Sequence, residues 1–377
     1  MSQWEAKWVG HWDKAVRKSD ALRAALCRHL RVEMAIALGA SVVEVFYDCE
    51  KFYDSISPEL VARAGIALEY PPGLLYLGLV MHMAPKVLRH KGAYSLPVLA
   101  SKGILVGCMQ SVTWTRVFLW EMLDFAHKQF KPVKIESWVD DLVLLAIGSS
   151  TQVPRLAADA SLYVTKELAR RGCTVSPTKT CYMASSRHVG WRFARRVAIR
   201  GRTFIKKAAS VRDLGVNACM RQRRIGIGMG RRKAATARGK VIKRFTKHAA
   251  QATKLVKTGW MPQATWGAAV SGLAPSTQLR LRGQLAEISG HRKAGGCSTT
   301  TIRLTFGRRA DPLVQLKVDL LVAWARVLMT EGVQKWQRVW QWWKERLVRK
   351  PVARRWRRIG WARWCCHRHP ARPWLES

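Results

Sequence analysis

Acidic residues are scarce in the second half of this 377-residue chain. Residues 185–377 contain 44 Lys and Arg but only 7 Asp and Glu, and no carboxylate lies between residues 214 and 286. A surface this positive repels itself unless a polyanion neutralises it, so nucleic acid is the expected partner. A membrane surface is the lesser alternative. Acids are better represented before residue 185, where 17 of them accompany 22 Lys and Arg.

Long apolar runs, a signal peptide and paired cysteines are also missing. No run could span a bilayer, and the first residues lack the layout of a secretory signal. The nine cysteines have no disulfide-like spacing, and the 365–369 Cys and His cluster lacks the spacing of a zinc site. We therefore expect an intracellular, nuclear protein with no membrane partner and no zinc. Its length and 48% hydrophobic residues allow two or three domains with cores.

Two adjacent carboxylates, Asp140 and Asp141, stand between two apolar runs in residues 137–145. This pattern predicts a β-hairpin with acidic residues at its turn. Like charges so close repel each other, and a divalent cation, which prefers oxygen ligands, would compensate for them. A solvated Asp-Asp turn without a metal is the alternative interpretation.

A second β-branched and aromatic run, residues 42–47, leads directly into Asp48. A strand that brought Asp48 beside the 140–141 turn would gather carboxylates from two strands, which suits a two-metal phosphoryl transfer. An ordinary residue at a strand end is the alternative for Asp48. Asp54 precedes a helix start at Ser57, and we interpret it as structural.

Five segments, in order, resemble the palm motifs of reverse transcriptases. Residues 48–54 (Asp-Cys-Glu-Lys-Phe-Tyr-Asp) resemble the first motif, and residues 138–141 (Trp-Val-Asp-Asp) the third. Residues 103–111 are similar to the second, Gly-x-x-Gln-Gly-Cys-Pro-x-Ser. Residues 172–180 match the fourth, and residues 211–216 resemble the Leu-Gly element before the thumb. The likeness is greatest to enzymes of non-LTR retroelements and group II introns, and five ordered motifs are more specific than any one of them.

The chain departs from that family at three places. Val106 stands where the family has Gln, and Met109 where it has Pro, both near the template and the incoming base. Only 47 residues precede Asp48, where the family carries a longer fingers region with basic residues for the triphosphate. We therefore expect a fragment truncated at the amino terminus, a decayed element, or a chain with reduced fingers.

The resemblance implies a fold and a reaction. The fold would be α+β: a right-hand polymerase palm, with an antiparallel sheet and packed helices, followed by a basic helical thumb. The reaction would be RNA-directed DNA synthesis on an RNA template, with a DNA primer or RNA–DNA duplex and dNTPs as partners. Two Mg²⁺ ions, or Mn²⁺, would be held by Asp48, Asp140 and Asp141.

Four further residues receive roles from the same resemblance. Tyr53 would lie under the incoming sugar and exclude a ribose 2′-hydroxyl, and Lys179 would steady or protonate the pyrophosphate. Gly107 and Ser111 would line the side of template and nucleotide. A core aromatic is the alternative for Tyr53, and a solvated lysine for Lys179.

Two other functions stay open at this point. One is a catalytically inactive or truncated nucleic-acid-binding protein derived from a retroelement. The other is an RNA-dependent RNA polymerase, against which Tyr53 argues because such enzymes need room for the 2′-hydroxyl. No group of carboxylates beyond residue 184 resembles a nuclease site, so we expect no ribonuclease H or endonuclease domain.

Local patterns predict the following elements. Helices are expected at 19–39, 57–68, 71–83 (buried), 107–130, 153–171 and 234–257, a hairpin within 86–101, short strands at 189–193 and 197–204, and a flexible turn through Gly226, Gly228 and Gly230. The predicted regions are 1–39 (helical fingers-side remnant), 40–205 (palm), 206–290 (thumb), 291–301 (linker) and 302–377 (Trp- and Arg-rich helical region).

Cations and aromatics in the second half are candidate nucleic-acid contacts. Three tryptophans fall on one helical face beside cations, which suits stacking on single-stranded nucleic acid. Packing of that face on the thumb is the alternative. The candidates are Arg221, Arg223, Arg224, Arg231, Arg232, Lys233, Trp336, Trp340 and Trp343.

Overall fold

The computed structural model describes residues 2–201, 205–220, 226–245, 249–291, 295–331 and 337. The chain divides into two compact units. Unit 1 comprises Met1–Ala21 and Val32–Ala209, and unit 2 comprises Leu22–Arg31 and Ser210–Ser377. None of the described helices is both long and apolar enough to cross a membrane.

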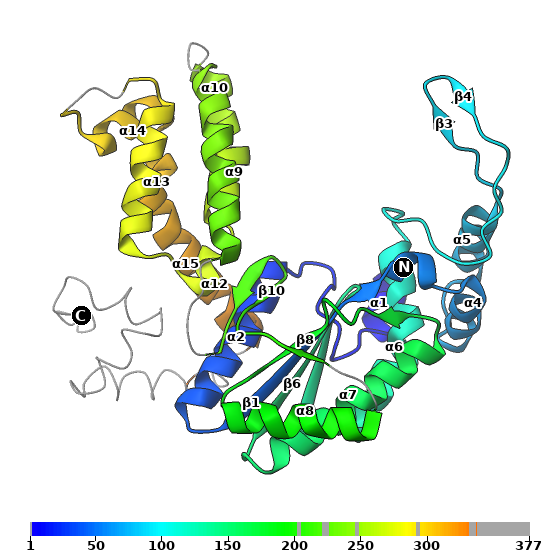
Figure 1. Cartoon of the computed structure of the whole chain (residues 1–377). Coiled ribbons are helices and arrows are strands. Elements are labelled where there is room, and N and C mark those ends of the chain that lie inside the picture. The colour runs from blue at the N-terminus through cyan, green and yellow to red at the C-terminus, as the bar shows by residue number, and fades with distance from the viewer. Residues whose placement is uncertain are drawn as a thin grey trace. The chain divides into compact units, whose positions relative to one another are not determined.

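A five-stranded sheet of order β5-β6-β1-β8-β9 is the frame of unit 1 (Figure 1). Its strands are antiparallel except for the parallel β8–β9 pair. The central strand β1 is almost entirely buried, as its β-branched and aromatic residues predict. This antiparallel sheet with packed helices confirms the predicted α+β class. The strands are β1 (Ser41–Tyr47), β5 (Val133–Trp138), β6 (Asp141–Gly148), β8 (Cys181–Ala184) and β9 (Lys206–Lys207).

Three helices cover one face of this sheet (Figure 1). They are α6 (Ser111–Gln129), α7 (Gln152–Arg170) and α8 (Arg187–Gly201). Alternate residues of β1, including Val45, share one buried core with side chains of these helices such as Phe118 and Phe193. The helices α6 and α7 were predicted. The short strands expected at 189–193 and 197–204 are wrong, because the buried residues there recur at helical spacing in α8.

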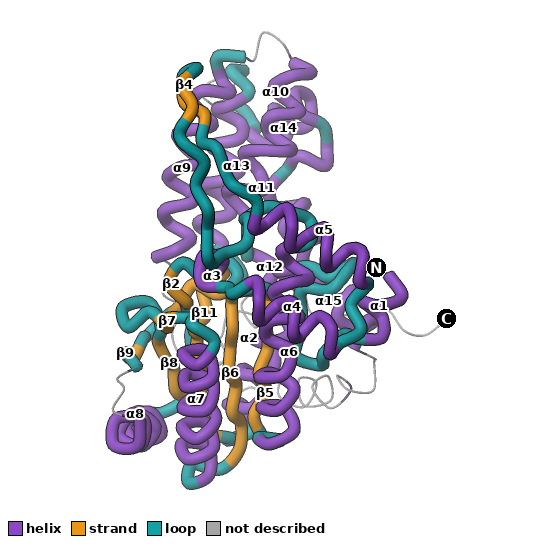
Figure 2. The backbone as a smooth tube through the Cα atoms, turned by 90° about the vertical axis from the view of Figure 1, so that its right-hand side faces the viewer, coloured by secondary structure: helices purple, strands orange, loops and turns teal. Residues whose placement is uncertain are grey.

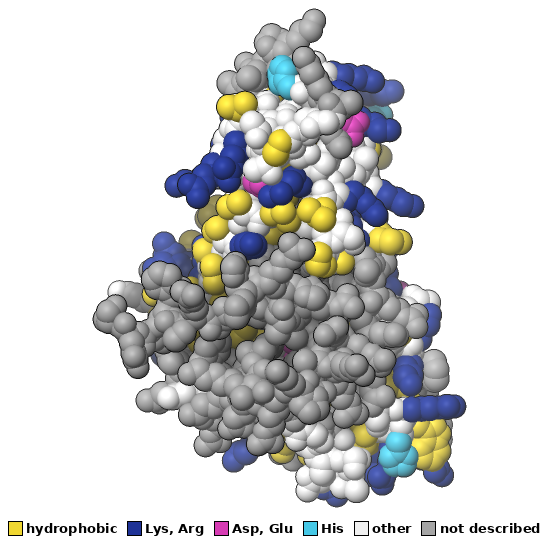
Figure 3. Space-filling model, turned by 90° about the vertical axis from the view of Figure 1, so that its left-hand side faces the viewer, with side chains coloured by type: hydrophobic (Ala, Val, Ile, Leu, Met, Phe, Trp, Pro, Cys, Tyr) yellow, Lys and Arg dark blue, Asp and Glu magenta, His cyan; other side chains and the backbone are white. Residues whose placement is uncertain are grey.

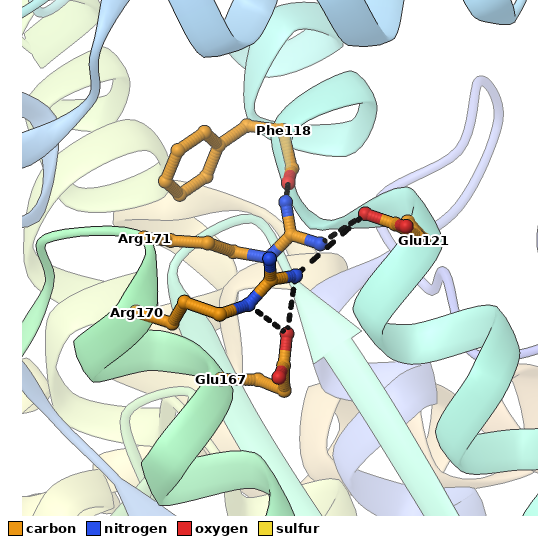
Figure 4. Close-up of polar contacts among 5 residues, drawn as sticks. All are labelled: Phe118, Glu121, Glu167, Arg170 and Arg171. Atoms are coloured by element: carbon orange, nitrogen blue, oxygen red, sulfur yellow. Dashed lines mark hydrogen bonds and ion pairs between the residues drawn. The ribbon is translucent and has the colours of Figure 1, made fainter.

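Arg171 joins the end of α7 to α6 (Figure 4). Its buried guanidinium donates to the carbonyl oxygen of Phe118 at 3.0 Å and to Oε2 of Glu121 at 2.8 Å. The neighbouring Arg170 donates to Oε2 of Glu167 within α7. These contacts fix the point from which the 172–180 segment departs.

The N-terminal segment packs on unit 1. Trp4 and Trp12 belong to its core, and the main chain around Trp12 exchanges hydrogen bonds with Ser137 at the edge of β5. The buried Arg116 of α6 donates to Asp13. Since Leu22–Arg31 belongs instead to unit 2, residues 1–39 are not the separate region that we predicted. The helices here are α1 (Ser2–Lys7) and α2 (Ala21–Ala37).

Between the first and second motifs lie α3 (Phe52–Ser55), α4 (Pro58–Ala67) and α5 (Pro72–Met83). Ser57 caps α4 as predicted, with its Oγ accepting from the backbone N–H of Leu60. Helix α5 forms where expected, but the prediction that it is buried is wrong. Only a narrow stripe of Leu75, Gly78 and His82 is buried, so most of its apolar side chains are exposed.

A two-stranded arm follows α5 and is drawn beside it in Figure 2. It consists of β3 (Arg89–His90) and β4 (Ala93–Tyr94), as the expected hairpin within 86–101 requires. Among the described residues there are two other short pairs: β2 (Cys49–Glu50) with β7 (Thr174–Val175), and β10 (Val211–Asp213) with β11 (Val216–Ala218).

Unit 2 is mainly helical, with a core that includes Trp260, Leu285 and Phe306. The buried Arg28 of α2 donates to Asp213 at 2.5 Å, which ties Leu22–Arg31 to this unit. The helices are α9 (Gly226–Lys243), α10 (Ala249–Leu255), the π-helix η1 (Val256–Trp260), α11 (Met261–Thr265), α12 (Ala268–Ser271), α13 (Pro275–Ile288), α14 (Ser298–Phe306), the 3-10 helix η2 (Arg308–Ala310) and α15 (Pro312–Glu331).

Three predictions for this region need correction. Gly226, Gly228 and Gly230 begin α9 instead of forming a turn, and the helix expected over 234–257 is divided between α9, α10 and η1. The expected linker 291–301 already contains the start of α14. Ile302 and Phe306 of α14 are buried in the core shared with α13, so the region from residue 302 does not begin as a separate body.

Candidate active site

The register of the sheet brings Asp48 to the acidic hairpin. Tyr47, the last residue of β1, pairs with Leu142 of β6, and this is the final pair of the ladder. Asp48, which follows Tyr47, and Asp141, which precedes Leu142, therefore leave the ladder at the same end. Trp138 pairs with Asp141 on the other side, which leaves Val139 and Asp140 as a two-residue turn. Carboxylates that are remote in sequence therefore meet at one edge of the sheet.

The turn itself is strained. Val139 has φ of +59°, a conformation that a β-branched residue rarely adopts and that glycine usually supplies in such hairpins. The hydroxyl of Ser137 donates to the carbonyl oxygen of Val139 at 2.9 Å and holds the turn in this form. Strain that the surrounding structure imposes beside a candidate ligand favours a functional explanation of the turn.

The pKa of Asp140 is raised by the surroundings of its carboxyl group. Burial raises the pKa of its carboxyl, the backbone N–H of the same residue lowers it, and the charge of Asp48 raises it again. The two carboxylates are thus close enough to repel each other across a partly dry space. Lys179 partly relieves this repulsion, since its Nζ donates to Oδ1 of Asp48 at 3.3 Å. Both partners of that ion pair are exposed to solvent, so its contribution is modest.

The fourth motif wraps around Asp48. The backbone N–H of Ser176 donates to the carbonyl oxygen of Asp48 at 2.8 Å, and the backbone N–H of Asp48 donates to Oγ1 of Thr180 at 3.2 Å. The β2–β7 pair continues this contact. These bonds bring Lys179 to the carboxylates, and they give Thr180 an anchoring role that the motif comparison did not predict.

Tyr53 lies on α3 within the field of the same carboxylates. Burial raises the pKa of its hydroxyl first, the charge of Asp140 adds to the rise, and hydrogen bonding with the side chain of Thr115 acts in the opposite direction. Thr115 is buried in α6 and also donates to the carbonyl oxygen of Ser111 at 2.9 Å. No spacing in the sequence pointed to Thr115.

Cys49 is also near the carboxylates. Its pKa is raised to about 12, by burial first and then by the charges of Cys173, Asp48 and Asp140. Burial and these neighbouring charges thus disfavour the thiolate form that a nucleophile would need.

The second motif forms a loop that is fastened to α3 and α5. The backbone N–H of Gly103 donates to the carbonyl oxygen of Ile56, and that of Ile104 donates to the carbonyl oxygen of Tyr53. The backbone N–H of Leu105 donates to Nδ1 of the buried His82 at 2.9 Å. Gly103 has φ of +98°, and a Cβ there would come within 3.2 Å of the backbone of Asp54, so any other residue would be strained at this position.

Gly107 and Ser111 differ in their availability to a ligand. Gly107 has φ of +86° and open space where a Cβ would lie. Ser111 is buried at the start of α6, and its hydroxyl donates to the carbonyl oxygen of Leu105. Ser111 therefore supports the loop, while Val106 and Met109, the residues that depart from the motif, are exposed at 74% and 95%.

The carboxylates fit a divalent cation that takes its other ligands from water and phosphate oxygens. Mg²⁺ in phosphoryl-transfer sites commonly uses one or two carboxylates in this way. Asp48 and Asp140 supply two, and their repulsion is what a cation would relieve. A cage of protein ligands alone is not present: no three His, Cys, Asp or Glu side chains are grouped to hold a metal within the residues that the structure describes.

The predicted nucleic-acid contacts are only partly described. Arg231, Arg232 and Lys233 lie on α9. The guanidinium of Arg231 lies 5.9 Å from the ring centroid of Trp266, and its pKa is lowered by burial and then by Arg212. Burial and then Arg280 lower the pKa of Arg232. The other candidates, Arg221, Arg223, Arg224, Trp336, Trp340 and Trp343, lie outside the described residues.

Basic side chains are prominent on the surface of the described elements. On the face drawn in Figure 3, Lys and Arg side chains are numerous and acidic ones few. This agrees with the excess of positive charge in the sequence.

Comparison with known proteins finds similarity only among solved structures. No protein-family model and no curated protein sequence matches the chain. Telomerase from Candida tropicalis in complex with a TWJ fragment of telomeric RNA is 10% identical, over 89% of this chain and 54% of that one, with a TM-score of 0.44.

Two further structures are similar to the same extent. Apo telomerase from Candida tropicalis is 10% identical over 90% of this chain and 59% of that one, with a TM-score of 0.43. Telomerase from Candida albicans with a TWJ fragment is 11% identical over 87% and 53%, with a TM-score of 0.38. The chain thus corresponds to somewhat more than half the length of each of these three structures.

Proposed function

We propose that unit 1 is a polymerase palm that adds deoxynucleotides to a primer 3′-hydroxyl on an RNA template, as reverse transcriptases do. One observation carries the proposal: Asp48 and Asp140, 92 positions apart, lie at one sheet edge with mutually repelling carboxylates. Asp48, Asp140 and Lys179 lie close together at this edge, and all three were candidates from the sequence.

The side chains of the site divide the work between them. Asp48 and Asp140 would bind divalent cations such as Mg²⁺, with the adjacent Asp141 assisting, and the cations would supply activation of the 3′-hydroxyl and neutralisation of the triphosphate. Lys179 forms an ion pair with Asp48. Its positive charge would stabilise the leaving pyrophosphate. Thr180 and Ser176 hold the backbone of Asp48 in place during these changes of charge.

Tyr53 is the candidate for choosing the sugar. Its ring is partly buried and packs on the core of unit 1, so the ring would be a wall against a 2′-hydroxyl. An RNA-dependent RNA polymerase would need that space. Incorporation of dNTPs in preference to NTPs supports the DNA polymerase, and the opposite preference supports the RNA polymerase.

The experiment is primer extension on an RNA template with Mg²⁺ or Mn²⁺. Asp140→Asn removes one charge with little change of shape, and we expect a loss of about 100-fold or more in extension, as for other preorganised electrostatic groups. Asp54→Asn is the matched control, because Asp54 is an exposed carboxylate on the neighbouring α3. Extension by the Asp140→Asn protein at the wild-type rate would contradict the proposal.

A binding protein without polymerase activity is the second candidate. The ion pair between Lys179 and Asp48 already satisfies one carboxylate, and Val106 and Met109 replace motif residues in the loop beside the site. This candidate is supported if the wild-type chain binds primer–template but fails to extend it with either metal.

A further inference from the structure

Helix α8 presents two different faces. Val189, Phe193 and Val197 are buried against the sheet and α7. The opposite side carries Trp191, exposed at 55%, together with exposed arginines at helical spacing. We call Arg187, Trp191, Arg192 and Arg195 the α8 face. This helix lies between the fourth motif and the 211–216 element, and the proposed polymerase function uses none of these residues.

The arginines of α8 fall into a paired and an unpaired group. Arg196 and Arg200, on one flank, form ion pairs with Asp159 of α7. Arg187, Arg192 and Arg195 have no acidic partner in the part of the chain that the structure describes. The helix contains no Asp or Glu of its own. The positive charge of the α8 face is therefore free to meet an anion.

Trp191 and Arg195 form a composite surface. The guanidinium of Arg195 lies 5.3 Å from the ring centroid of Trp191. An exposed indole is a platform on which a nucleobase can stack, and guanidinium groups beside it can bind phosphate oxygens in a bidentate manner. Because every base has a flat π-face, such a platform does not require a particular sequence.

We propose that the α8 face binds single-stranded nucleic acid at a site separate from the candidate active site. The separation follows from the sheet. Ala184 at the end of β8 pairs with Val43 of β1, so α8 begins near the end of the sheet remote from Asp48. In Figure 1, α8 lies in front of the sheet, alongside α7. The proposal does not depend on polymerase activity.

A membrane surface fits the α8 face less well. Helices that bind membranes insert a wide apolar face, whereas the apolar side of α8 is already buried in the core. Only Trp191 and Ile199 are exposed large hydrophobic residues on this helix. Duplex nucleic acid fits less well too, because its bases are already stacked and are not available to Trp191.

Photocrosslinking tests the location directly. A 5-bromouridine-containing single strand is bound to the full chain without nucleotides, irradiated, and mapped by mass spectrometry after trypsin digestion. We expect crosslinks on the 188–192 peptide, in the wild type and equally in the Asp140→Asn variant. Crosslinks that avoid this peptide, or that disappear when a duplex competes, would overturn the proposal.

Binding measurements with matched variants test the chemistry. Arg192→Gln/Arg195→Gln removes two charges from the α8 face, and Arg196→Gln/Arg200→Gln removes two from the paired flank. We expect the first pair to weaken binding of a single-stranded RNA or DNA about tenfold and to reduce the log–log salt slope by about 1.4, since each phosphate contact on a single strand contributes about 0.7. The flank pair should weaken binding less than about twofold.

Trp191 distinguishes stacking from charge alone. Trp191→Ala should lose about tenfold in affinity, because removing one base-stacking aromatic typically costs a factor of about 5 to 150. Trp191→Phe should keep most of it. Thermal unfolding of each variant verifies the fold, which these exposed positions should leave intact. Equal losses for the face and flank pairs, or no loss with Trp191→Ala, would refute the site.

Discussion

Each unit contains one site at which like charges are crowded, and the two sites differ in the sign of that charge. In unit 1, Asp48 and Asp140 repel each other at a partly buried sheet edge, and the pKa of Asp140 rises as a result of burial and of that charge. In unit 2, Arg231 and Arg232 lie near further arginines, and burial together with those charges lowers their pKa. Both arrangements cost free energy in the isolated chain, and each would be relieved by a partner of the opposite charge: a divalent cation in the first case and a polyanion in the second.

Both units also contain charge that is already neutralised. Arg28 and Asp213 in unit 2, and Arg116 and Asp13 in unit 1, are buried ion pairs. In both pairs a buried arginine contacts a carboxylate of opposite charge. In the two crowded sites, by contrast, the neighbouring groups have the same charge. The contrast separates charge that is paired within the fold from charge that a bound ligand would neutralise.

We expect the largest change in the free energy of unfolding when a buried ion pair is broken. Asp213→Ala removes the carboxylate to which buried Arg28 donates, and we expect a loss of about 3–5 kcal/mol in the free energy of unfolding. Chemical denaturation measures this loss. The control is Glu59→Ala, which removes the exposed partner of Arg63 and should cost no more than about 0.5 kcal/mol. Similar losses for the two variants would remove the distinction between buried and exposed pairs.

An intermediate effect is expected from the crowded carboxylates. Because the folded-state pKa of Asp140 is raised above 3.8, this group favours the fold at acid pH, and that contribution is lost as pH rises through the folded pKa. Asp140→Asn should therefore stabilise the chain at pH 7, by about 0.5–2 kcal/mol as for other relieved surface charges. Its advantage should shrink below pH 4.

Mg²⁺ sharpens this prediction. With a millimolar dissociation constant, 10 mM Mg²⁺ would stabilise the wild type by about 1.4 kcal/mol. The Asp140→Asn variant should gain less. Equal thermal shifts in the two proteins would show that the carboxylate pair does not hold the cation.

The smallest effect concerns the cations of unit 2. Lys233 on α9 is exposed, whereas Arg231 is partly buried beside Trp266. Lys233→Gln should leave stability unchanged and lower the salt slope of RNA–DNA duplex binding by about 0.9 if Lys233 contacts one phosphate. Arg231→Gln should also reduce thermal stability. A salt slope unaffected by both changes would exclude this part of α9 as a contact surface.

The sequence predicted the elements whose signals are local. Short sequence patterns predicted the acidic hairpin, the Ser57 cap and helices α6 and α7. The burial of α5 could not be predicted in this way. Its apolar residues are compatible with a core helix, and only the neighbours that it meets decide that Tyr76 and Met81 stay exposed.

Short apolar segments were the other source of error. Residues 189–204 contain β-branched and aromatic residues that fit a strand, but the buried positions of α8 fall four residues apart. Propensity is weak over so short a segment, and packing against α7 and the sheet decides in favour of the helix. The same packing leaves Trp191 and its arginines on the outside.

The sequence by itself determined which residues carry charge and where the chain can turn, because these depend on side-chain chemistry and on neighbours along the chain. It also identified Asp48, Asp140, Asp141 and Lys179 as candidates. Only the tertiary structure decided that Asp48, Asp140 and Lys179 meet, since that depends on the β1–β6 register and on hydrogen bonds from the 176–180 segment. Such long-range pairing reflects the packing of the whole core, which no local pattern encodes.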